Sequence, residues 1–292
     1  MEYQNFITII KEELEHISQK EVHLDRQSKN NDVIVDSLTI RDPAFNIAPT
    51  IYLTPYYARH LDGMSIQEIV RDIYDTYEQA APVSDFDVTQ YTDYQKAQQS
   101  ICMRLVNFEK NRERLRDLPH VRFHDLAIIF AYILPIEDKG YGAIVVHRNH
   151  LALWNVTVED LYAKAMENSP HILPVQIDTM DALMKRLCPE GVFPDDPQPQ
   201  MLVMSNSRSV YGAATILYPN VLKHLSDRYE KDLFIIPSSI HEVIVLPDES
   251  YDPEELSQLI CDVNEMELED TDILSDHPYY YSRQADEILM HP

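Results

Sequence analysis

Apolar residues recur every three or four positions in several stretches of the chain, a spacing that places them on one face of an amphipathic helix. The predicted helices begin near Tyr3, Ser65, Thr157, Asp178 or Thr179, Pro219 and Asp252. Their N-termini carry local start signals. Ser65 precedes Glu68 by three residues, as in a capping box, and Asp252 is followed by a proline in the first turn.

Short apolar runs bounded by turn residues predict strands between these helices. The predicted strands cover residues 33–40, 50–53, 101–108, 126–134, 141–147, 151–154, 201–204, 213–217 and 234–246. Because the elements do not alternate regularly as β-α-β, we expect an α+β fold with mixed or antiparallel sheets packed with amphipathic helices. Residues 81–93 are polar and show no helical pattern, so we expect an N-terminal domain over 1–92 and a C-terminal domain over 93–292.

The stretch LFIIPSSIHEVIVLPD, residues 233–248, places candidate catalytic residues between two apolar runs: Ser238, Ser239, His241 and Glu242. On a continuous strand, Ser239 and His241 share one face, while Ser238 and Glu242 point to the other. No third residue is evident to orient the histidine, as a nucleophilic site needs. We therefore favour a strand with a bulge or bend at Pro237, and a hydrolase built on these residues is the alternative.

A second polar cluster, HVRFHD, ends in His124 and Asp125. On a strand, His120, Arg122 and His124 project from one face and offer a site for an anion or a metal, or a hydrolase site that uses His124 and Asp125. A polar sheet edge explains the same pattern, and we favour it. HExxH and CxxC are absent, so the sequence predicts neither a metal nor a cofactor.

Charge changes this picture toward a binding protein. The net charge is −25, and residues 248–292 hold 14 acids against a single base, Arg283. The structural interpretation of this segment is a solvated acidic helix and tail. The functional interpretation is a segment that binds a basic surface of another protein. Direct nucleic-acid binding is disfavoured because clustered Lys and Arg are missing, whereas an acidic mimic of DNA remains an alternative. Tyr279, Tyr280 and Tyr281 are candidate interface anchors.

Missing motifs weigh against several enzyme classes. The chain has five glycines and lacks GxxxxGK[ST], GxGxxG and GxSxG, which disfavours P-loop nucleotidases, Rossmann dehydrogenases, protein kinases and α/β-hydrolases. No apolar run approaches 18 residues, so no membrane span is expected, and the start does not resemble a signal peptide. The three cysteines are far apart in the sequence, which argues against a disulfide framework and fits a protein of the reducing cytoplasm.

Several segments, in their order along the chain, resemble the bacterial domain-of-unknown-function family 5688. The segments are Asn107–Asn111, Phe123–Ile128, Trp154 with Thr157–Tyr162, Pro237–Glu242 and Leu274–Asp276. A fainter similarity links the chain to family 1444. The resemblance implies a bacterial, cytoplasmic protein and supplies no reaction or cofactor. We therefore predict a non-catalytic protein-binding or accessory protein, whose candidate binding residues beside the tyrosines are Asn107, Asn111, His124, Asp125, Trp154 and Asn206.

Overall fold

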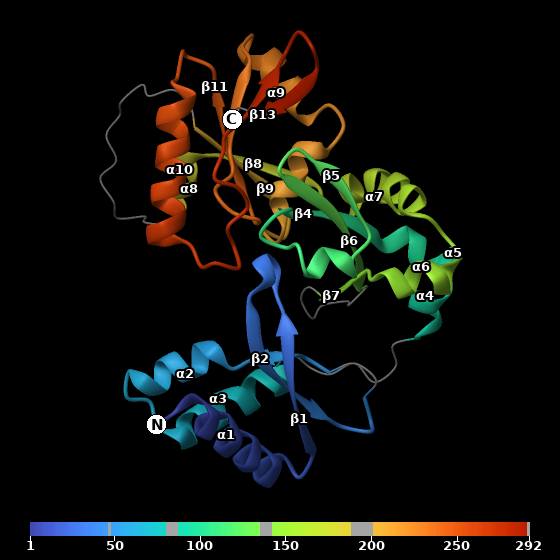
Figure 1. The fold of residues 1–292 in the computed structure, drawn as a ribbon, viewed down its shortest axis with the longest axis vertical. Helices are drawn as coiled ribbons and strands as arrows, with labels where there is room; N and C mark the ends of the chain where they lie inside the picture. The colour runs from blue at the N-terminus through green and yellow to red at the C-terminus, as the bar shows by residue number, and fades with distance from the viewer. Residues whose placement is uncertain (46–47, 80–86, 135–141, 188–200, 291–292) are drawn as a thin grey trace.

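The computed structural model describes residues 1–45, 48–79, 87–134, 142–187 and 201–290. An N-terminal unit, drawn in blue in Figure 1, consists of a three-stranded sheet with helices packed on it. Its elements are α1 (Tyr3–Ser18), β1 (Glu21–Ser28), a 3₁₀ turn η1 (Asn30–Asp32), β2 (Ile34–Arg41), β3 (Ile51–Tyr52), α2 (Thr54–Leu61) and α3 (Ile66–Gln79). Phe6, Ile10, Leu38 and Ile73 are fully buried in the core of this unit.

The middle of the chain forms a second antiparallel sheet. Its strands are β4 (Ile101–Asn107), β5 (His120–Phe123), β6 (Leu126–Leu134) and β7 (Gly142–Val145). β6 pairs with the other three, β5 along its first half and β7 along its second. The neighbouring helical elements are α4 (Thr89–Thr92), α5 (Tyr94–Ala97), η2 (Gln98–Ser100), η3 (Arg114–Arg116), α6 (Arg148–Trp154) and α7 (Val158–Ile172).

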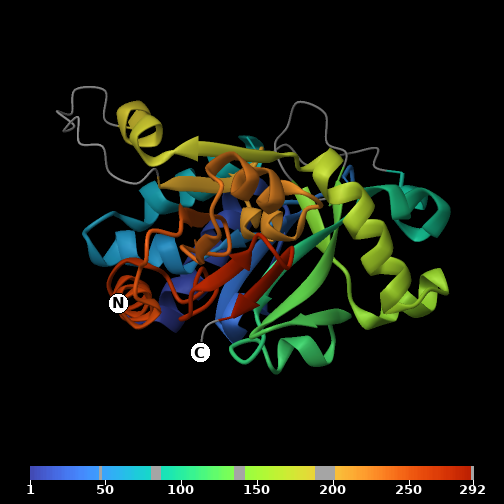
Figure 2. The same cartoon turned by 90° about the horizontal axis from the view of Figure 1, so that it is seen from above.

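The third sheet has six antiparallel strands in the order β13-β12-β10-β11-β9-β8. The strands and the intervening helices are β8 (Val175–Thr179), α8 (Met180–Leu187), β9 (Leu202–Asn206), η4 (Gly212–Leu217), α9 (Val221–Tyr229), β10 (Leu233–Ile236), β11 (Val243–Pro247), α10 (Pro253–Glu267), β12 (Tyr279–Ser282) and β13 (Glu287–Met290). Figure 2 shows α8 and α10 at the same end of this sheet. The large core joins this sheet to the middle one through Leu105, Phe130, Ile235 and Val245.

The expected α+β class with antiparallel sheets is therefore confirmed. The local helix signals are confirmed as well, because Ser65 and Glu68 exchange capping hydrogen bonds and Asp252 caps α10. Tyr91 of α4 packs on Trp154, within the large core. Among the described residues, the elements of the N-terminal unit end with α3 at Gln79 and α4 begins at Thr89, and the expected boundary at residue 92 stays a prediction.

Three strand predictions are wrong. Residues 151–154 belong to α6, because His147 and His150 form a capping box that starts a helix there. Residues 213–217 form η4, a 3₁₀ helix. The expected strand 234–246 is a hairpin of β10 and β11, in which Phe234 pairs with Leu246, and residues 237–242 form its connection. The bend at Pro237 is thus a complete reversal of the chain.

Candidate binding groove

The six-stranded sheet has two apolar faces, and α10 covers one of them incompletely. Side chains alternate along β10 and β11, so Leu233, Ile235, Val243 and Val245 enter the large core. Phe234, Ile236, Ile244 and Leu246 lie on the opposite face, where Leu256 of α10 packs against them. α10 does not cover the part of this face nearest β8 and β9, and that part forms the floor of a groove.

The groove has a volume of about 660 Å³. Residues of α10 form one wall, and the end of β8 with the start of α8 forms the other. The side chains lining it are mainly apolar and include Met180, Met201, Ile244, Leu246, Leu259 and Val263. Polar side chains are few, and Asp181 and Asn264 are among them.

The helix presents two rows of apolar residues with different exposure. Leu256 and Ile260 are 8% and 3% exposed and hold α10 on the sheet. Leu259 and Val263 are 54% and 37% exposed, although both line the groove. Helical spacing alone places all four on one side of the helix. The second row is instead partly exposed to solvent at the edge of the groove.

The surroundings of the groove are acidic. Residues 252–270, which include α10, contain no Lys or Arg, and their acids are Asp252, Glu254, Glu255, Asp262, Glu265, Glu267, Glu269 and Asp270. Asp181 adds a carboxylate on the opposite wall. The groove therefore combines an apolar lining that includes one carboxylate, Asp181, with an adjacent helix rich in acids, a charge that attracts cationic groups.

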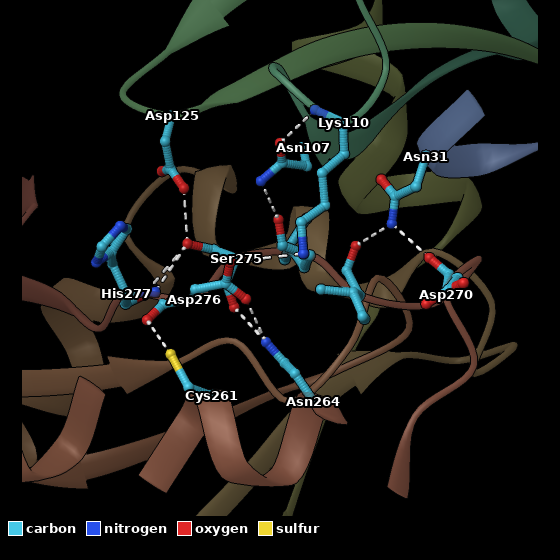
Figure 3. Close-up of polar contacts among 12 residues, drawn as sticks. Asn31, Asn107, Lys110, Asp125, Cys261, Asn264, Asp270, Ser275, Asp276 and His277 are labelled. Atoms are coloured by element: carbon cyan, nitrogen blue, oxygen red, sulfur yellow. Dashed lines mark hydrogen bonds and ion pairs between the residues drawn. The ribbon is translucent and has the colours of Figure 1, made fainter. Parts of the chain in front are cut away.

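A polar network behind the groove fixes the position of α10 (Figure 3). Asn264 is 5% exposed, and its amide nitrogen donates to the Ser275 carbonyl at 3.1 Å and to Oδ1 of Asp276 at 2.8 Å. Lys110 forms an ion pair with the other carboxylate oxygen of Asp276 at 3.5 Å. Asn107 donates to the Leu274 carbonyl at 3.0 Å. The segment after α10 is thus tied both to the helix and to the middle sheet.

The same network receives the tip of the β1–β2 hairpin from the N-terminal unit. The Asn31 side chain donates to the carbonyls of Asp270, at 2.6 Å, and Ile273, at 2.8 Å. Asn111 is fully buried; its Oδ1 accepts the backbone N–H of Asn31, and its amide donates to Oδ1 of Asn31. We call this set of contacts the hairpin-tip junction. It connects three segments that are far apart in the sequence.

A family model with the description “Family of unknown function (DUF5688)” matches residues 3–283. The chain belongs to DUF5688. This confirms the resemblance inferred from the sequence. No curated protein and no solved structure matches the chain. Three of the segments that carried the resemblance, Asn107–Asn111, Phe123–Ile128 and Leu274–Asp276, meet at the junction of this DUF5688 protein.

In the DUF5688 chain, Asp125 is partly buried and acts as a hydrogen-bond acceptor. Its two carboxylate oxygens accept the hydroxyls of Ser275 and Tyr279, each at 2.6 Å. Burial and the neighbouring Asp125 charge raise the pKa of Tyr279. His124 lies in the β5–β6 turn with a left-handed backbone, and its Nε2 contacts the Ile288 carbonyl at 3.0 Å. The structure therefore gives His124 and Asp125 separate partners.

The predicted catalytic segment forms a loop stabilised by hydrogen bonds. Ser239 Oγ accepts the backbone N–H of His241 at 3.0 Å, and Nδ1 of His241 accepts the backbone N–H of Tyr211 at 3.2 Å. Nε2 of His241 lies 3.5 Å from Asp272, an acidic partner that the sequence did not suggest. Ser238 lines the groove, whereas neither Ser239 nor His241 does. Glu242 contributes its carbonyl, which accepts the Ser239 N–H.

The aromatic and amide candidates are mostly interior. Tyr279 and Tyr281 are 1% and 4% exposed in β12, and Tyr280 is half-buried, so the side chains of Tyr279 and Tyr281, two of the candidate interface anchors, lie inside the fold. Trp154 is buried and donates its indole N–H to the Tyr91 carbonyl. Asn206 is 1% exposed, and its side chain closes the following loop by bonding Val210 and Arg208.

The acidic C-terminal segment is not a tail within the described residues. After α10 it forms the hairpin-tip junction and then β12, which pairs with β10 inside the sheet. In the whole described part of the chain, no helix is long and apolar enough to cross a membrane. The same residues contain no group of three His, Cys, Asp or Glu side chains that could hold a metal ion.

Proposed function

We propose that this DUF5688 protein is a non-catalytic accessory protein that binds a basic amphipathic helix of another protein in the groove beside α10. The observation that carries the proposal is the pair Leu259 and Val263, which line the apolar groove and remain half exposed. A helix laid in such a groove buries its own apolar residues at i, i+3, i+4 and i+7. α10 has 15 residues and is about 22 Å long, enough for about four turns of a partner helix.

Charge supports a basic partner. Residues 252–270 carry eight acids and Asp181 lines the opposite wall, so Lys or Arg residues flanking the apolar stripe of a partner would lie near negative charge. Attraction of this kind mainly raises the association rate and falls with added salt. The hydrolase alternative has less support, because Nδ1 of His241 already accepts a backbone N–H and Ser239 Oγ accepts another.

The test uses synthetic helical peptides of about 18 residues, roughly five turns, with a leucine stripe and either lysine or glutamate on the remaining positions. We expect saturable binding of the lysine peptide, measured by fluorescence anisotropy, and a lower affinity at higher salt. The double variant L259Q/V263Q removes two groove contacts that together stabilise binding by about 1.5 kcal/mol, or about tenfold.

Met266 provides the matched control, because it is 74% exposed on the same helix and does not line the groove. M266Q should bind as the wild type does. For charge, E255Q/D262N should weaken binding and its salt dependence, whereas E12Q/E13Q on α1 should not. Equal binding of the glutamate peptide, or unchanged affinity in L259Q/V263Q, refutes the proposal.

A further inference from the structure

β1 is an edge strand of the N-terminal sheet, because the order of that sheet is β1-β2-β3 and β1 pairs with β2 alone among the described strands. The strand runs from the end of α1 toward the hairpin-tip junction (Figure 1). Leu24, Asp25 and Arg26 follow one another near its middle and are all exposed, so both faces of the strand meet solvent there. An uncovered edge of this kind is a template for pairing with another strand.

The hairpin shows which backbone groups face the open edge. The Lys29 N–H donates across the hairpin to the Val33 carbonyl at 2.8 Å, and residues of an antiparallel strand alternate between facing the neighbouring strand and facing away. The even-numbered residues of β1 therefore direct N–H and C=O outward, as the Val22 N–H does when it donates to Oε1 of Glu15 at 3.3 Å. Within the described residues, the backbone of Leu24 has no hydrogen-bond partner on that side.

A second copy of the chain offers the same edge, and two-fold symmetry limits how the two strands can pair. Outward-facing residues must meet each other, so the two-fold axis passes through a residue of β1 and not between two residues. An axis through His23 places Glu21 opposite Asp25. Axes through Asp25 or Arg26 place a charged residue opposite itself, and like charges directly opposite each other are destabilising. An axis through Leu24 avoids these contacts, and axes nearer the strand ends pair fewer residues.

We propose that β1 is a dimerisation edge, on which two copies of this chain pair antiparallel about an axis through Leu24. The two Leu24 side chains, each 36% exposed in the single chain, meet at the axis and bury apolar surface. His23 lies opposite Asp25 and Glu21 opposite Gln27, and both pairs are able to form hydrogen bonds. The charges that oppose the other registers thus favour this one, and the pairing joins the two N-terminal sheets into a single sheet.

The test measures the mass of the full chain by sedimentation velocity at about 5 to 500 µM, the range in which small interfaces associate. We expect monomers at the low end and dimers at the high end. L24K replaces the apolar contact at the axis by two ammonium groups, so it should weaken dimerisation about tenfold. I34K is the matched control, because Ile34 is a 62% exposed apolar residue of the same hairpin that lies on β2, away from this edge. It should dimerise as the wild type does.

A charge exchange tests the register. H23E places a carboxylate opposite Asp25 and should weaken the dimer about fivefold, whereas H23E/D25K makes the opposed charges attractive again and should restore it. Circular dichroism checks the fold of each variant. Should a variant not fold, hydrogen exchange of the wild type serves, since residues 21–28 should exchange more slowly at the high concentration. A wild type that stays monomeric at about 500 µM overturns the proposal. Equal dimerisation of L24K and I34K, or no restoration in H23E/D25K, also overturns it.

Discussion

The hairpin-tip junction makes a quantitative prediction about Asn31, whose backbone is left-handed at φ 59°. Asn31→Ala removes three side-chain hydrogen bonds, to Asp270, Ile273 and Asn111, worth about 3 kcal/mol together. Alanine also tolerates the left-handed backbone poorly, which adds about 1 kcal/mol. We therefore expect the free energy of unfolding to fall by about 4 kcal/mol.

Two variants separate these contributions. Asn31→Gly keeps the left-handed backbone at little cost, so it should lose about 3 kcal/mol. Asn155 provides the matched control: it is an exposed asparagine at φ 54° that ends α6, and no hydrogen bond of its side chain is observed in the described structure. Asn155→Ala should cost only the backbone contribution of about 1 kcal/mol.

The assay is urea unfolding followed with two probes. Circular dichroism reports the whole chain, whereas fluorescence of the single tryptophan, Trp154, reports the C-terminal unit. Because the junction joins the two units, N31A should move apart the urea midpoints reported by the two probes. N155A should leave the difference between these midpoints as it is in the wild type. A loss below about 1 kcal/mol in N31A, with both probes unchanged, would refute the importance of these hydrogen bonds.

Two further predictions concern the glycine Gly212, compared with Gly63, and the histidine His150. A Cβ at Gly212 would collide with Ser205 Oγ and the His241 carbonyl, so Gly212→Ala should destabilise the fold by about 3 kcal/mol, whereas Gly63→Ala, at φ 104° with open space around it, should cost about 1 kcal/mol in the same urea assay. Equal losses in both would contradict the collision. Burial, and then the charge of His147, lower the pKa of His150 below its usual 6.5. The unfolded chain therefore binds a proton first as pH falls through 6.5, and the stability that His150 contributes is lost below that pH. The difference in unfolding free energy between wild type and H150N should shrink on acidification, and parallel pH curves would contradict this.

Local signals made much of the fold predictable. The N-terminal residues of α3, α7 and α10 were recognised because their caps involve partners within four residues, such as Thr157 with Asp160. The hairpin of β10 and β11 was missed because its connection depends on distant groups. The Ile240 N–H donates to the Asp272 carbonyl, and no sequence spacing indicates that contact. Apolar runs alone could not distinguish a strand from a short helix at 151–154 or 213–217.

The candidate groove was predicted only in part. The acidic helix was recognised, but periodicity could not show that Leu259 and Val263 lie beyond the edge of the covered sheet face, since this depends on where β8 and β9 are placed. The hairpin-tip junction had a sequence signal only in the resemblance segments around Asn107 and Ser275, because its partners are as far as 242 residues apart.

The hairpin-tip junction also bears on how the protein is made. The core of the N-terminal unit is complete by Tyr77, so this unit has its own apolar contacts while the rest of the chain is still on the ribosome. The carbonyls that receive the amide groups of Asn30 and Asn31 are translated about 240 residues later. At the 5–20 residues per second typical of synthesis, the hairpin tip stays uncovered for roughly 10–50 s. Because the uncovered tip has the polar sequence Asn-Asn-Asp, it adds no exposed apolar surface to the nascent chain during that interval.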